Sequence, residues 1–576
     1  MTLVIAAVAY HFTLNFSPET GAFAGISGDD YFAPDGLSAL FTYLLQGLCV
    51  PCVFFALRRD LPKTALYAML LFQLSAWVLV STDRLLLFLF AWEGMGLATF
   101  LLALNGSGFR PALNYLVQMH VGGACLFAAY LHSGAETWSE LELTGTTAAL
   151  MAVGFGFKAG LPGLHTWMGP TYGSVLRGAL PVFGLAVNFG IYGFARMYLC
   201  LPDDLLFAMG TVWVFWGVAG SLYGVTLACM DGDAFRVPAF STMENMGLIT
   251  TALGAAALGA AGHVSGAAAP AFAGAVLHVF NHAVAKSLLF FTAVAAVEKM
   301  SSSKLDAGGG LMKSIPKWGG LALFAAVALC GLPPLNAFSS ELLIYLALFR
   351  DLERTEAFSL MVSLAALLGL CLSGGLSIFA FARWFGVLFL GRPRQAPSPE
   401  QGVPAGTAPA WALAALALVV GMWPGQTIAA VESLLHSEPF ETGPVDGTAW
   451  APAGAILLVV LIRLVMGRKK SSGPVWGCGF PQTTPKIQYT AHAFSRSLGI
   501  FQREKTFGLK PVFPEKAFFK VSVTDPAAFA IRRLSLGFVR LFRPLYAIQT
   551  GQVRHYVLYA FVFILVLTAL SLIESR

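Results

Sequence analysis

The chain has 576 residues, of which 57% are hydrophobic and 11% charged, and its mean hydropathy is +0.71. This composition excludes an ordinary soluble domain and indicates an integral membrane protein. The formal net charge of +6 gives no reason to expect a nucleic-acid partner, because lysine and arginine in short loops orient a chain in the membrane.

Apolar segments of about 18 residues or more are long enough to cross a bilayer as helices. The sequence therefore predicts an all-α polytopic membrane protein with about fifteen transmembrane helices. The expected spans are residues 2–17, 36–57, 62–80, 84–104, 115–132, 145–162, 179–200, 205–229, 237–257, 270–297, 318–349, 357–390, 408–430, 449–467 and 554–573. The first span has an uncharged start and lacks a small-residue cleavage site, so we expect it to be retained rather than removed as a signal peptide.

Basic and acidic loops alternate between these spans, as expected if basic loops stay on the cytoplasmic side. The basic stretches are 58–63, 299–317, 392–394 and 468–470, and the acidic ones are 19–35, 136–142, 203–204 and 432–446. This alternation requires residues 318–349 to form one span despite Pro333-Pro334. The N-terminus is then cytoplasmic and the C-terminus external.

Several ionisable residues fall inside the apolar spans, where a charge costs at least about 2.5–3.5 kcal/mol. They are Glu93, His120, Lys158, His165, Glu244, His278, His282, Lys286 and Glu341. Intramembrane residues of this kind usually face partners or water and mark an ion path.

The eight cysteines give no sign of redox chemistry. Cys49-Val-Pro-Cys52 has the spacing of a redox motif, but it lies in an apolar helix without a second pair, which favours a packing role. The sequence contains no haem motif, Walker loop, dinucleotide-binding glycine pattern or cofactor-ligand cluster of cysteines. We therefore expect no cofactor, no metal and no catalytic residue in this chain.

Glycine and proline interrupt two spans in different halves of the chain, one around Lys158 and one around Pro333-Pro334. Discontinuous helices in corresponding places of two halves indicate a transport site, because unwound backbone that lines a cavity can meet ions. Proline kinks that only help packing are the alternative. Lys158 and Glu341 each lie within about two turns of a break, which favours transport.

His278, His282 and Lys286 follow one another at intervals of four, so they share one stripe of a helix and cover about 12 Å of its length. Histidine titrates near neutrality and can take up a proton on one nitrogen while it releases one from the other, which suits a relay. Histidines that only form hydrogen bonds in a core are the alternative. Three titratable groups on one apolar helix favour the relay.

Two further carboxylates lie inside spans. Glu93 has no basic residue near it on its own helix, so it needs a partner from another helix, and Lys158 is the expected one. This pair either changes its charge during transport or is a static ion pair between helices. Glu244 either bridges the two halves or only satisfies Asn245 and Ser241, and the sequence favours neither.

Four ordered motifs carry a family resemblance: Trp92-Glu93 and residues 158–167, 281–290 and 331–338. In these motifs the chain resembles the antiporter-like membrane subunits of respiratory complex I and its relatives, which include the Mrp antiporters. Glu244-Asn245 and residues 475–495 resemble, more narrowly, the large membrane subunit of hydrogenase-4 and formate hydrogenlyase complexes.

The resemblance implies a proton channel built from two inverted five-helix repeats, 84–229 and 237–390, with discontinuous helices near Lys158 and Pro333-Pro334. Further transmembrane helices are expected in 1–80, 408–467 and 554–576. The implied proton pathway has Glu93 and Lys158 as a coupled pair, His278, His282 and Lys286 as the central relay and Glu341 as the exit-side group. His120, His165 and Glu244 are possible auxiliary residues.

The sequence departs from the family pattern in two places. Relatives commonly hold a lysine or histidine where this chain has Asn188. Because asparagine cannot carry a charge, the step between Lys158 and His278 has to use water, His120 or His165, or it is impaired. In relatives, the helix that carries this position usually begins with a Pro/Ser-rich stretch. Residues 174–181 of this chain differ from that stretch, so the sequence does not fix where the helix begins.

Residues 468–553 are polar and basic and differ in kind from the rest. Arg532, Arg533, Arg540 and Arg543 stand among apolar residues at helical spacing from about 527 to 548, which predicts an amphipathic helix along the cytoplasmic interface. Relatives carry a lateral helix or a docking surface near this end, so we expect an assembly segment. A solvated linker before the last span is the alternative.

Three functions compete. The first is a proton-translocating membrane subunit of a redox-driven complex resembling hydrogenase-4 or formate hydrogenlyase and related to NADH:quinone oxidoreductase. This would be a subunit of an oxidoreductase complex with no redox centre of its own, partnered by other membrane subunits and by separate electron-carrying peripheral subunits. The others are a subunit of a multisubunit cation/proton antiporter and a transport-inactive scaffold, which Asn188 makes conceivable. Residues 475–495 favour the first, and the expected location is the inner (plasma) membrane.

Overall fold

The computed structural model describes residues 34–59, 61–106, 108–262, 267–352, 357–394, 406–435 and 488–495. It also describes the shorter pieces 16–17, 22–23, 32, 454, 461, 502–507, 518–523, 525–544 and 552–574. The chain divides into two compact units, Met1–Val523 and Thr524–Arg576.

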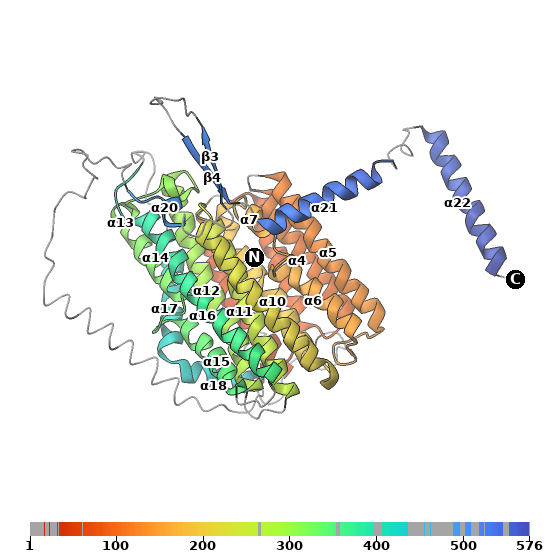
Figure 1. Cartoon of the computed structure of the whole chain (residues 1–576), viewed down its shortest axis with the longest axis horizontal. Coiled ribbons are helices and arrows are strands. Elements are labelled where there is room, and N and C mark those ends of the chain that lie inside the picture. The colour runs from red at the N-terminus through yellow and green to blue at the C-terminus, as the bar shows by residue number, and fades with distance from the viewer. Residues whose placement is uncertain are drawn as a thin grey trace. The chain divides into compact units, whose positions relative to one another are not determined.

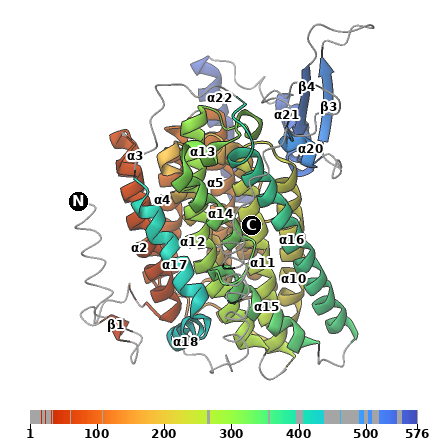
Figure 2. The ribbon, with the colours of Figure 1, turned by 90° about the vertical axis from the view of Figure 1, so that its left-hand side faces the viewer.

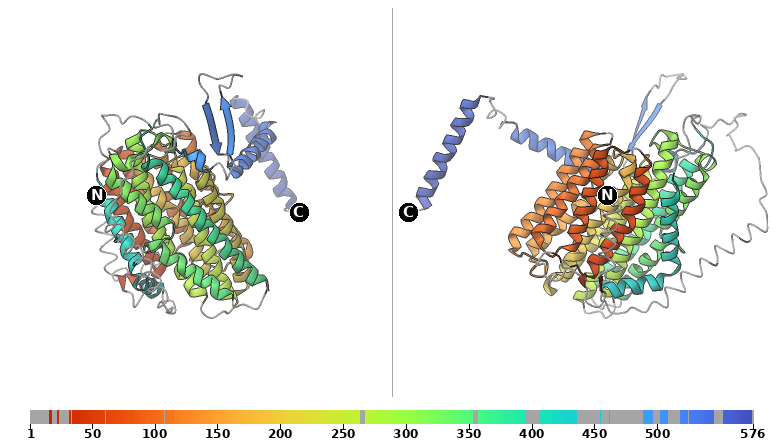
Figure 3. Two further views of the ribbon diagram at one scale, coloured as in Figure 1. Left: turned by 60° about the vertical axis from the view of Figure 1, so that its left-hand side comes forward. Right: turned by 180° about the vertical axis from the view of Figure 1, so that it is seen from behind.

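The first unit is a bundle of helices that run roughly parallel to one another (Figures 1 and 3). Its longer helices are α2 (Gly36–Leu57), α3 (Lys63–Ser81), α4 (Leu85–Leu104), α5 (Phe109–Ser133), α6 (Gly145–Ala159), α9 (Asn188–Leu199), α10 (Asp203–Met230), α11 (Arg236–Ala261), α12 (Ala268–Met300), α14 (Pro316–Leu329), α15 (Asn336–Asp351), α16 (Ala357–Phe389), α17 (Ala408–Met422) and α18 (Pro424–Leu435). Short helices are α7 (Met168–Tyr172), α8 (Leu180–Ala186), α13 (Leu311–Ser314) and α20 (Ala491–Ser495).

Two small antiparallel sheets add to the helices that the sequence predicts. Strand β1 (Phe16–Ser17) pairs with β2 (Ala22–Phe23), and β3 (Gln502–Phe507) pairs with β4 (Phe518–Val523). The expectation of an all-α chain therefore holds for the bundle and misses these two hairpins.

Within the described residues, eight helical spans are long and apolar enough to cross a membrane, or nine if the bent pair α17 and α18 forms one span. Helix α2 begins and ends at the residues expected from the sequence, 36 and 57. The expected number of fifteen is not confirmed. Of the expected spans, 2–17 lies outside the described residues apart from its end in β1, and 449–467 lies outside them apart from two isolated positions.

The expected span 408–430 is not one straight helix. Helices α17 and α18 are bent by 91° at Trp423, whose backbone leaves the helical region. Pro424 follows directly and begins α18, in keeping with a residue that lacks an N–H and cannot continue the hydrogen bonding of the preceding helix. Apolar residues resume at Ile428 on the far side of the bend, which is why apolar run length alone predicts a single span here.

The expected single helix over 318–349 is also interrupted. Residues 330–335, which include Pro333-Pro334, separate the 14-residue α14 from the 16-residue α15. Figures 1 and 2 show α14 and α15 one above the other along the bundle, so the pair together runs through its depth. The interruption itself agrees with the predicted discontinuous helix. A second interruption follows Lys158, because α6 ends at Ala159 with Gly160 in the left-handed region at φ +72°.

Helix α12 runs through the middle of the bundle (Figure 2). It packs against α2, α8, α11, α14, α15 and α17, and almost every side chain from Pro270 to Val297 is buried. A helix enclosed on all sides is expected to be apolar all round. Polar residues on α12 therefore have to find partners on its neighbours.

Glycines bring α10 and α11 into backbone contact. A Cβ on Gly217 would lie 2.5 Å from the carbonyl oxygen of Gly247, and one on Gly224 would lie 2.6 Å from the backbone nitrogen of Glu244. Small residues of this kind let helices associate in membranes, where water contributes little driving force between helices. This contact fixes the backbone that carries Glu244.

One end of the bundle is joined by an ion pair between α2 and α9. The Arg196 guanidinium forms a bidentate contact with the Asp35 carboxylate, donates to Ser38 Oγ at 2.7 Å and donates to the Tyr192 hydroxyl at 2.9 Å. Asp35 also caps α2 by accepting from Ser38 N at 2.9 Å. Burial alone would raise the pKa of Asp35, but Arg196 outweighs this and holds that pKa below its ordinary value of 3.8.

The other end carries a latch, which we define as residues 488–495 with α20. Buried Arg383 of α16 donates to Ala491 O at 2.9 Å and to the carbonyls of Ala228, Met230 and Asp231 at the end of α10. Ala491 N in turn donates to Asp306 Oδ1 at 2.7 Å. The last carbonyls of a helix have no partner inside it, so Arg383 both satisfies the end of α10 and holds the latch.

The second unit contains α21 (Pro526–Phe542) and α22 (Val553–Glu574). Asp525 caps α21 by accepting from Ala527 N at 2.9 Å. Helix α21 overlaps the expected amphipathic segment of about 527 to 548 but ends at Phe542. The bounds of α22 agree within one residue with those of the expected last span, 554–573.

We expect Asp35→Asn to lower the melting temperature of the purified protein in detergent, because it leaves the buried Arg196 guanidinium without its counter-charge while the cap to α2 survives. The loss should be about 1–2 kcal/mol, less than the about 3–5 kcal/mol of a fully buried pair, because Asp35 is half-exposed. The exposed Glu142→Gln is the matched control and should have little effect.

The same pair predicts a pH dependence. Because folding lowers the pKa of Asp35, its stabilisation is complete above the ordinary value of 3.8 and is lost as the pH falls through the folded-state pKa. The difference in melting temperature between wild type and Asp35→Asn should be constant above about pH 5 and shrink below about pH 4. A difference that stays constant down to the acid limit of folding would contradict the ionic origin of the effect.

Candidate functional site

Three titratable residues of α12 lie on one stripe at the centre of the bundle, as the sequence predicts. His278, His282 and Lys286 are each fully buried. His278 lies between two neighbouring helices, because its Nδ1 is 2.9 Å from Ser340 Oγ of α15 and its Nε2 is 3.0 Å from Asn245 Oδ1 of α11. One imidazole therefore joins α11, α12 and α15.

His282 differs from its neighbour on the stripe. Among the described residues neither of its ring nitrogens has a hydrogen-bond partner. An unsatisfied buried polar group costs about 1–3 kcal/mol, and such groups in native proteins usually need an explanation in function or in a bound water. His282 is therefore the position on α12 where packing alone explains least.

Lys286 is connected to Glu244 through a serine. Lys286 Nζ donates to Ser241 Oγ at 3.0 Å and to Pro238 O at 3.2 Å, and Ser241 Oγ donates to Glu244 Oε2 at 3.2 Å. Both charged side chains are buried, so each stabilises the other across one hydroxyl. The lysine and the carboxylate come from different helices, α12 and α11.

Glu244 also reaches beyond its own helix. Its carboxylate accepts from Ser373 Oγ at 3.3 Å and from Ser377 Oγ at 3.4 Å, both on α16. Asn245 Nδ2 donates to the Ser241 carbonyl at 2.8 Å. Of the two readings left open by the sequence, the structure thus gives Glu244 contacts with Ser241 and with another helix, and it does not limit the carboxylate to local satisfaction.

The interruption between α14 and α15 lies against α12. Asn281 Nδ2 donates to Asn336 O at 2.8 Å, and Asn336 Nδ2 donates back to Asn281 O at 2.9 Å. The carboxylate of Glu341 lies against Gly331, where a Cβ would come within 2.3 Å of its Oε2. The first turns of α15 thus bring Ser340 to His278 and Glu341 to the interruption.

Lys158 lies apart from this network, near the end of α6. It is buried, its Nζ is 4.4 Å from the centroid of the Trp92 ring, and it has no hydrogen-bond partner among the described residues. A lysine over a tryptophan face is attracted by the ring electrons. Within the same residues Lys158 forms no ion pair at contact distance with Glu93, and the coupling of the two charges expected from the sequence stays a prediction.

Glu93 instead lies beside α5. Its Oε2 is 3.7 Å from His120 Nε2, and its Oε1 occupies a notch at Gly123, where a Cβ would come within 1.8 Å. Both side chains are partly exposed, 41% for Glu93 and 57% for His120, although both lie midway along apolar helices. His120, an auxiliary residue in the sequence analysis, is therefore the residue that the structure brings to Glu93.

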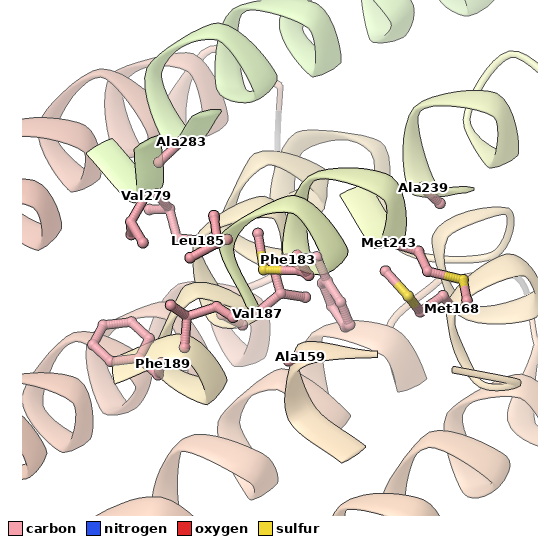
Figure 4. Packing of buried hydrophobic residues seen from close by; sticks show 14 of the residues in the cluster. Ala159, Met168, Phe183, Leu185, Val187, Phe189, Ala239, Met243, Val279 and Ala283 are labelled. Atoms are coloured by element: carbon pink, nitrogen blue, oxygen red, sulfur yellow. The ribbon is translucent and has the colours of Figure 1, made fainter. Parts of the chain in front are cut away.

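An apolar region separates the two groups of titratable residues. Figure 4 shows Leu185 of α8, and Val187 between α8 and α9, lying between Ala159 of α6 and Ala283 of α12. Asn188 is buried in this region, and its Nδ2 donates to Gly184 O at 3.1 Å and Leu185 O at 3.3 Å, the helical turn before it. His165 is buried with its ring against Tyr223.

Sequence reasoning named Ser241 and Asn245 beside Glu244 but missed the other neutral members of the network. Ser340, Ser373 and Ser377 also carry its hydrogen bonds, yet single serines in apolar helices are common. The signal that was present is the spacing of Ser373 and Ser377, four residues apart on α16, which places both hydroxyls on one face. Among the described residues, no group of three or more His, Cys, Asp or Glu side chains could hold a metal ion.

This arrangement, in which Lys286, Glu244 and His278 are linked to neighbouring helices of an apolar bundle by hydrogen bonds, can be compared with known proteins. Residues 82–369 match the family described as NADH:quinone oxidoreductase/Mrp antiporter, transmembrane. The chain belongs to this family. Of the nine titratable residues singled out above, every one from Glu93 to Glu341 lies within the matched part.

Proteins with similar sequences support this membership. Hydrogenase-4 component B of Escherichia coli (strain K12) is 28% identical over 77% of this chain and 73% of its own length. An uncharacterized protein of Mycobacterium tuberculosis (strain ATCC 25618 / H37Rv) is 30% identical over 81% of this chain and 79% of its own length. Formate hydrogenlyase subunit 3 of E. coli is 28% identical over 62% of this chain and 60% of its own length.

Solved structures share the fold. A chain of the membrane-bound sulfane sulfur reductase, an archaeal respiratory membrane complex, gives a TM-score of 0.75 at 20% identity and covers 98% of this chain and 95% of its own. A chain of the Mrp complex from Dietzia sp. DQ12-45-1b gives a TM-score of 0.67 at 18% identity, and the match covers 100% of this chain and 60% of that chain. The protein is thus an antiporter-like membrane subunit of the type found in hydrogenase and NADH:quinone oxidoreductase complexes, and such subunits have other membrane subunits as partners.

We expect Gly331→Ala to displace Glu341, because the new methyl group would overlap its carboxylate. The left-handed backbone at φ +62° adds a cost of about 1–2 kcal/mol for a residue with a Cβ. Gly320→Ala is the matched control, since a Cβ there has open space and alanine favours the helix by about 0.5–1 kcal/mol. The melting temperature should fall for Gly331→Ala and should stay the same or rise for Gly320→Ala. Equal melting temperatures would show that the interruption tolerates a side chain.

Proposed function

We propose that the chain is a proton-translocating membrane subunit of a redox-driven complex, of the hydrogenase-4 and formate hydrogenlyase kind. The observation that carries this proposal is the buried network around α12. Lys286, Ser241 and Glu244 form consecutive hydrogen bonds of 3.0 and 3.2 Å, and His278 links Asn245 to Ser340 at 3.0 and 2.9 Å. Buried titratable groups at such distances can exchange protons and are costly unless they serve a function.

The residues take the following roles in the proposal. Lys286 and Glu244 exchange charge through Ser241, and His278 and His282 conduct protons along α12. Glu341, at the interruption before α15, is the exit-side group. Lys158 with Glu93 and His120 forms a separate group at the first interruption.

The two groups have to communicate across the apolar region of α8 and α9. Asn188 cannot carry the charge of a proton. Its side-chain amide donates hydrogen bonds to the carbonyls of Gly184 and Leu185 in the preceding turn, which belongs to α8. The coupling that we propose between Lys158 and the central network is therefore electrostatic or uses water rather than a protonatable side chain at this position. In the low dielectric of a bundle interior, charges interact over longer distances than in water.

The surrounding assembly is part of the proposal. Residues 84–229 and 237–390 are the two inverted repeats, the membrane is the inner (plasma) membrane, and electron-carrying peripheral subunits are separate chains. Residues 468–553 serve assembly. The relatives named hydrogenase-4 component B and formate hydrogenlyase subunit 3 support this assignment, and this chain would contribute no redox centre of its own.

A subunit of a multisubunit cation/proton antiporter is the second candidate. The family description names the Mrp antiporter, which supports it, and the same network would serve. Genes beside this one that encode nickel-iron hydrogenase or ferredoxin-type subunits would favour the first candidate, and genes for small antiporter subunits the second. A scaffold without transport is the third, and the next two experiments test it.

We expect His282→Ala and Lys286→Ala each to remove most proton transfer, and the double variant to resemble either single one. Residues that conduct in series give such non-additive losses, because one break already stops the flow. Proton uptake by the reconstituted complex, normalised to folded protein, measures the effect. If the residues only pack, the losses should appear as about 1–3 kcal/mol of stability each, and transport per folded molecule should stay intact.

We expect Lys158→Met to abolish coupled proton movement without preventing assembly, because methionine is apolar, fits a buried site and favours helix. The measurement is the proton ratio of the reconstituted complex, with the exposed Lys317→Met as matched control. A Lys158→Met complex that pumps at the wild-type ratio would remove Lys158 from the pathway and leave the central network as the only candidate.

A further inference from the structure

Helix α21 has two opposite faces of different chemistry. At about 100° per residue, Ile531, Leu534, Phe538, Leu541 and Phe542 fall on one arc of about 100°. The arginines fall on the opposite arc: Arg532, Arg533, Arg540 and Arg543. None of the residues of α21 is buried, and Leu534, Phe538 and Leu541 are 64%, 61% and 70% exposed.

The arginine face carries four positive charges and no negative one, although Leu536, which is 50% exposed, lies on the same arc. No Asp or Glu occurs between 526 and 543, and the carboxylate just before them, Asp525, is used to cap the helix. Phe529 lies on the arginine side, but the guanidinium of Arg533 is 4.7 Å above its ring and covers it. Guanidinium groups bind phosphate oxygens through paired hydrogen bonds. The charge of this face therefore complements a layer of anionic phosphates.

The chain itself holds α21 near a bilayer. Residues 556–573 of α22 contain no charged residue, and at 1.5 Å per residue α22 is about 33 Å long, enough to cross a membrane. Only residues 543–552 separate the two helices, and ten residues reach at most about 36 Å. A helix with four arginines at this distance from a span belongs on the cytoplasmic side.

We propose that α21 lies in the cytoplasmic surface of the membrane and binds anionic phospholipid headgroups. The apolar face, with Leu534, Phe538 and Leu541, enters the boundary between headgroups and acyl chains. The four arginines meet lipid phosphates from the other side of the helix, since their long stems can reach along it. This lipid site goes beyond proton transfer and does not depend on it. It leaves the part of 468–553 before α21 for contacts with other subunits.

The test uses the full-length chain in nanodiscs of phosphatidylcholine alone or with about one third phosphatidylglycerol, and measures amide hydrogen exchange of residues 526–542. We expect exchange to slow by about tenfold or more in the anionic nanodiscs. The variant with Arg532, Arg533, Arg540 and Arg543 all replaced by Gln should lose this protection, because Gln favours helix but carries no charge. Residues 268–300 of α12 serve as the internal reference for folding of the bundle.

A matched control replaces four lysines of the basic stretch 299–317, which is expected on the cytoplasmic side, by Gln: Lys299, Lys304, Lys313 and Lys317. It should keep the protection of α21, which separates a local effect of the arginines from the loss of four positive charges. Equal exchange of 526–542 in the two lipid compositions would overturn the proposal. So would protection that is independent of lipid and appears only when other subunits of the complex are added, since that outcome would make the apolar face a protein-docking surface.

Discussion

The enclosure of α12 is the constraint on which the rest of the bundle depends. A helix packed on all sides in a membrane protein has no water to solvate a lysine or a histidine, so each polar group must be satisfied by a neighbouring helix or by a function that justifies its cost. Two neighbours supply the partners of α12: α11 brings Ser241 and Asn245, and α15 brings Asn336 and Ser340. Helix α16 in turn donates to Glu244 of α11.

These neighbours can supply partners only because their backbones are placed in unusual ways. The glycines of α10 let it touch α11, which positions the turn that carries Glu244. The interruption between α14 and α15 starts a new helix in the middle of the bundle, so the polar residues of a first turn, Asn336 and Ser340, face α12 where a continuous helix would present apolar ones. The same glycine and proline positions therefore determine both how closely the helices pack and which polar groups can form hydrogen bonds to α12.

Much of this was predictable from the sequence, and the remainder has a physical reason. The length of the apolar run predicted both ends of α2 correctly. The spacing of four residues predicted that His278, His282 and Lys286 share one stripe of a helix. The bend at Trp423 was not predicted, because hydropathy carries no information on the direction of the backbone. The β3–β4 hairpin was not predicted either. The contact between Glu93 and His120 was also not predicted. Trp92 and Glu93 are adjacent and point about 100° apart on α4, so when the tryptophan ring meets Lys158 the carboxylate turns towards His120. Pairings across helices depend on rotation about each axis, which no single sequence fixes.

The hydrogen bonds of Arg383 join parts of the bundle that lie far apart in the chain. Its guanidinium and its partner Ala491 are 108 residues apart, and α17 and α18 are made between them. During synthesis α10 and α16 can already lie together in the membrane, while the carbonyl that completes the set around Arg383 has not yet left the ribosome. A chain that stops before Ala491 would contain every residue of the buried network and still leave a buried guanidinium incompletely bonded at the end of α10.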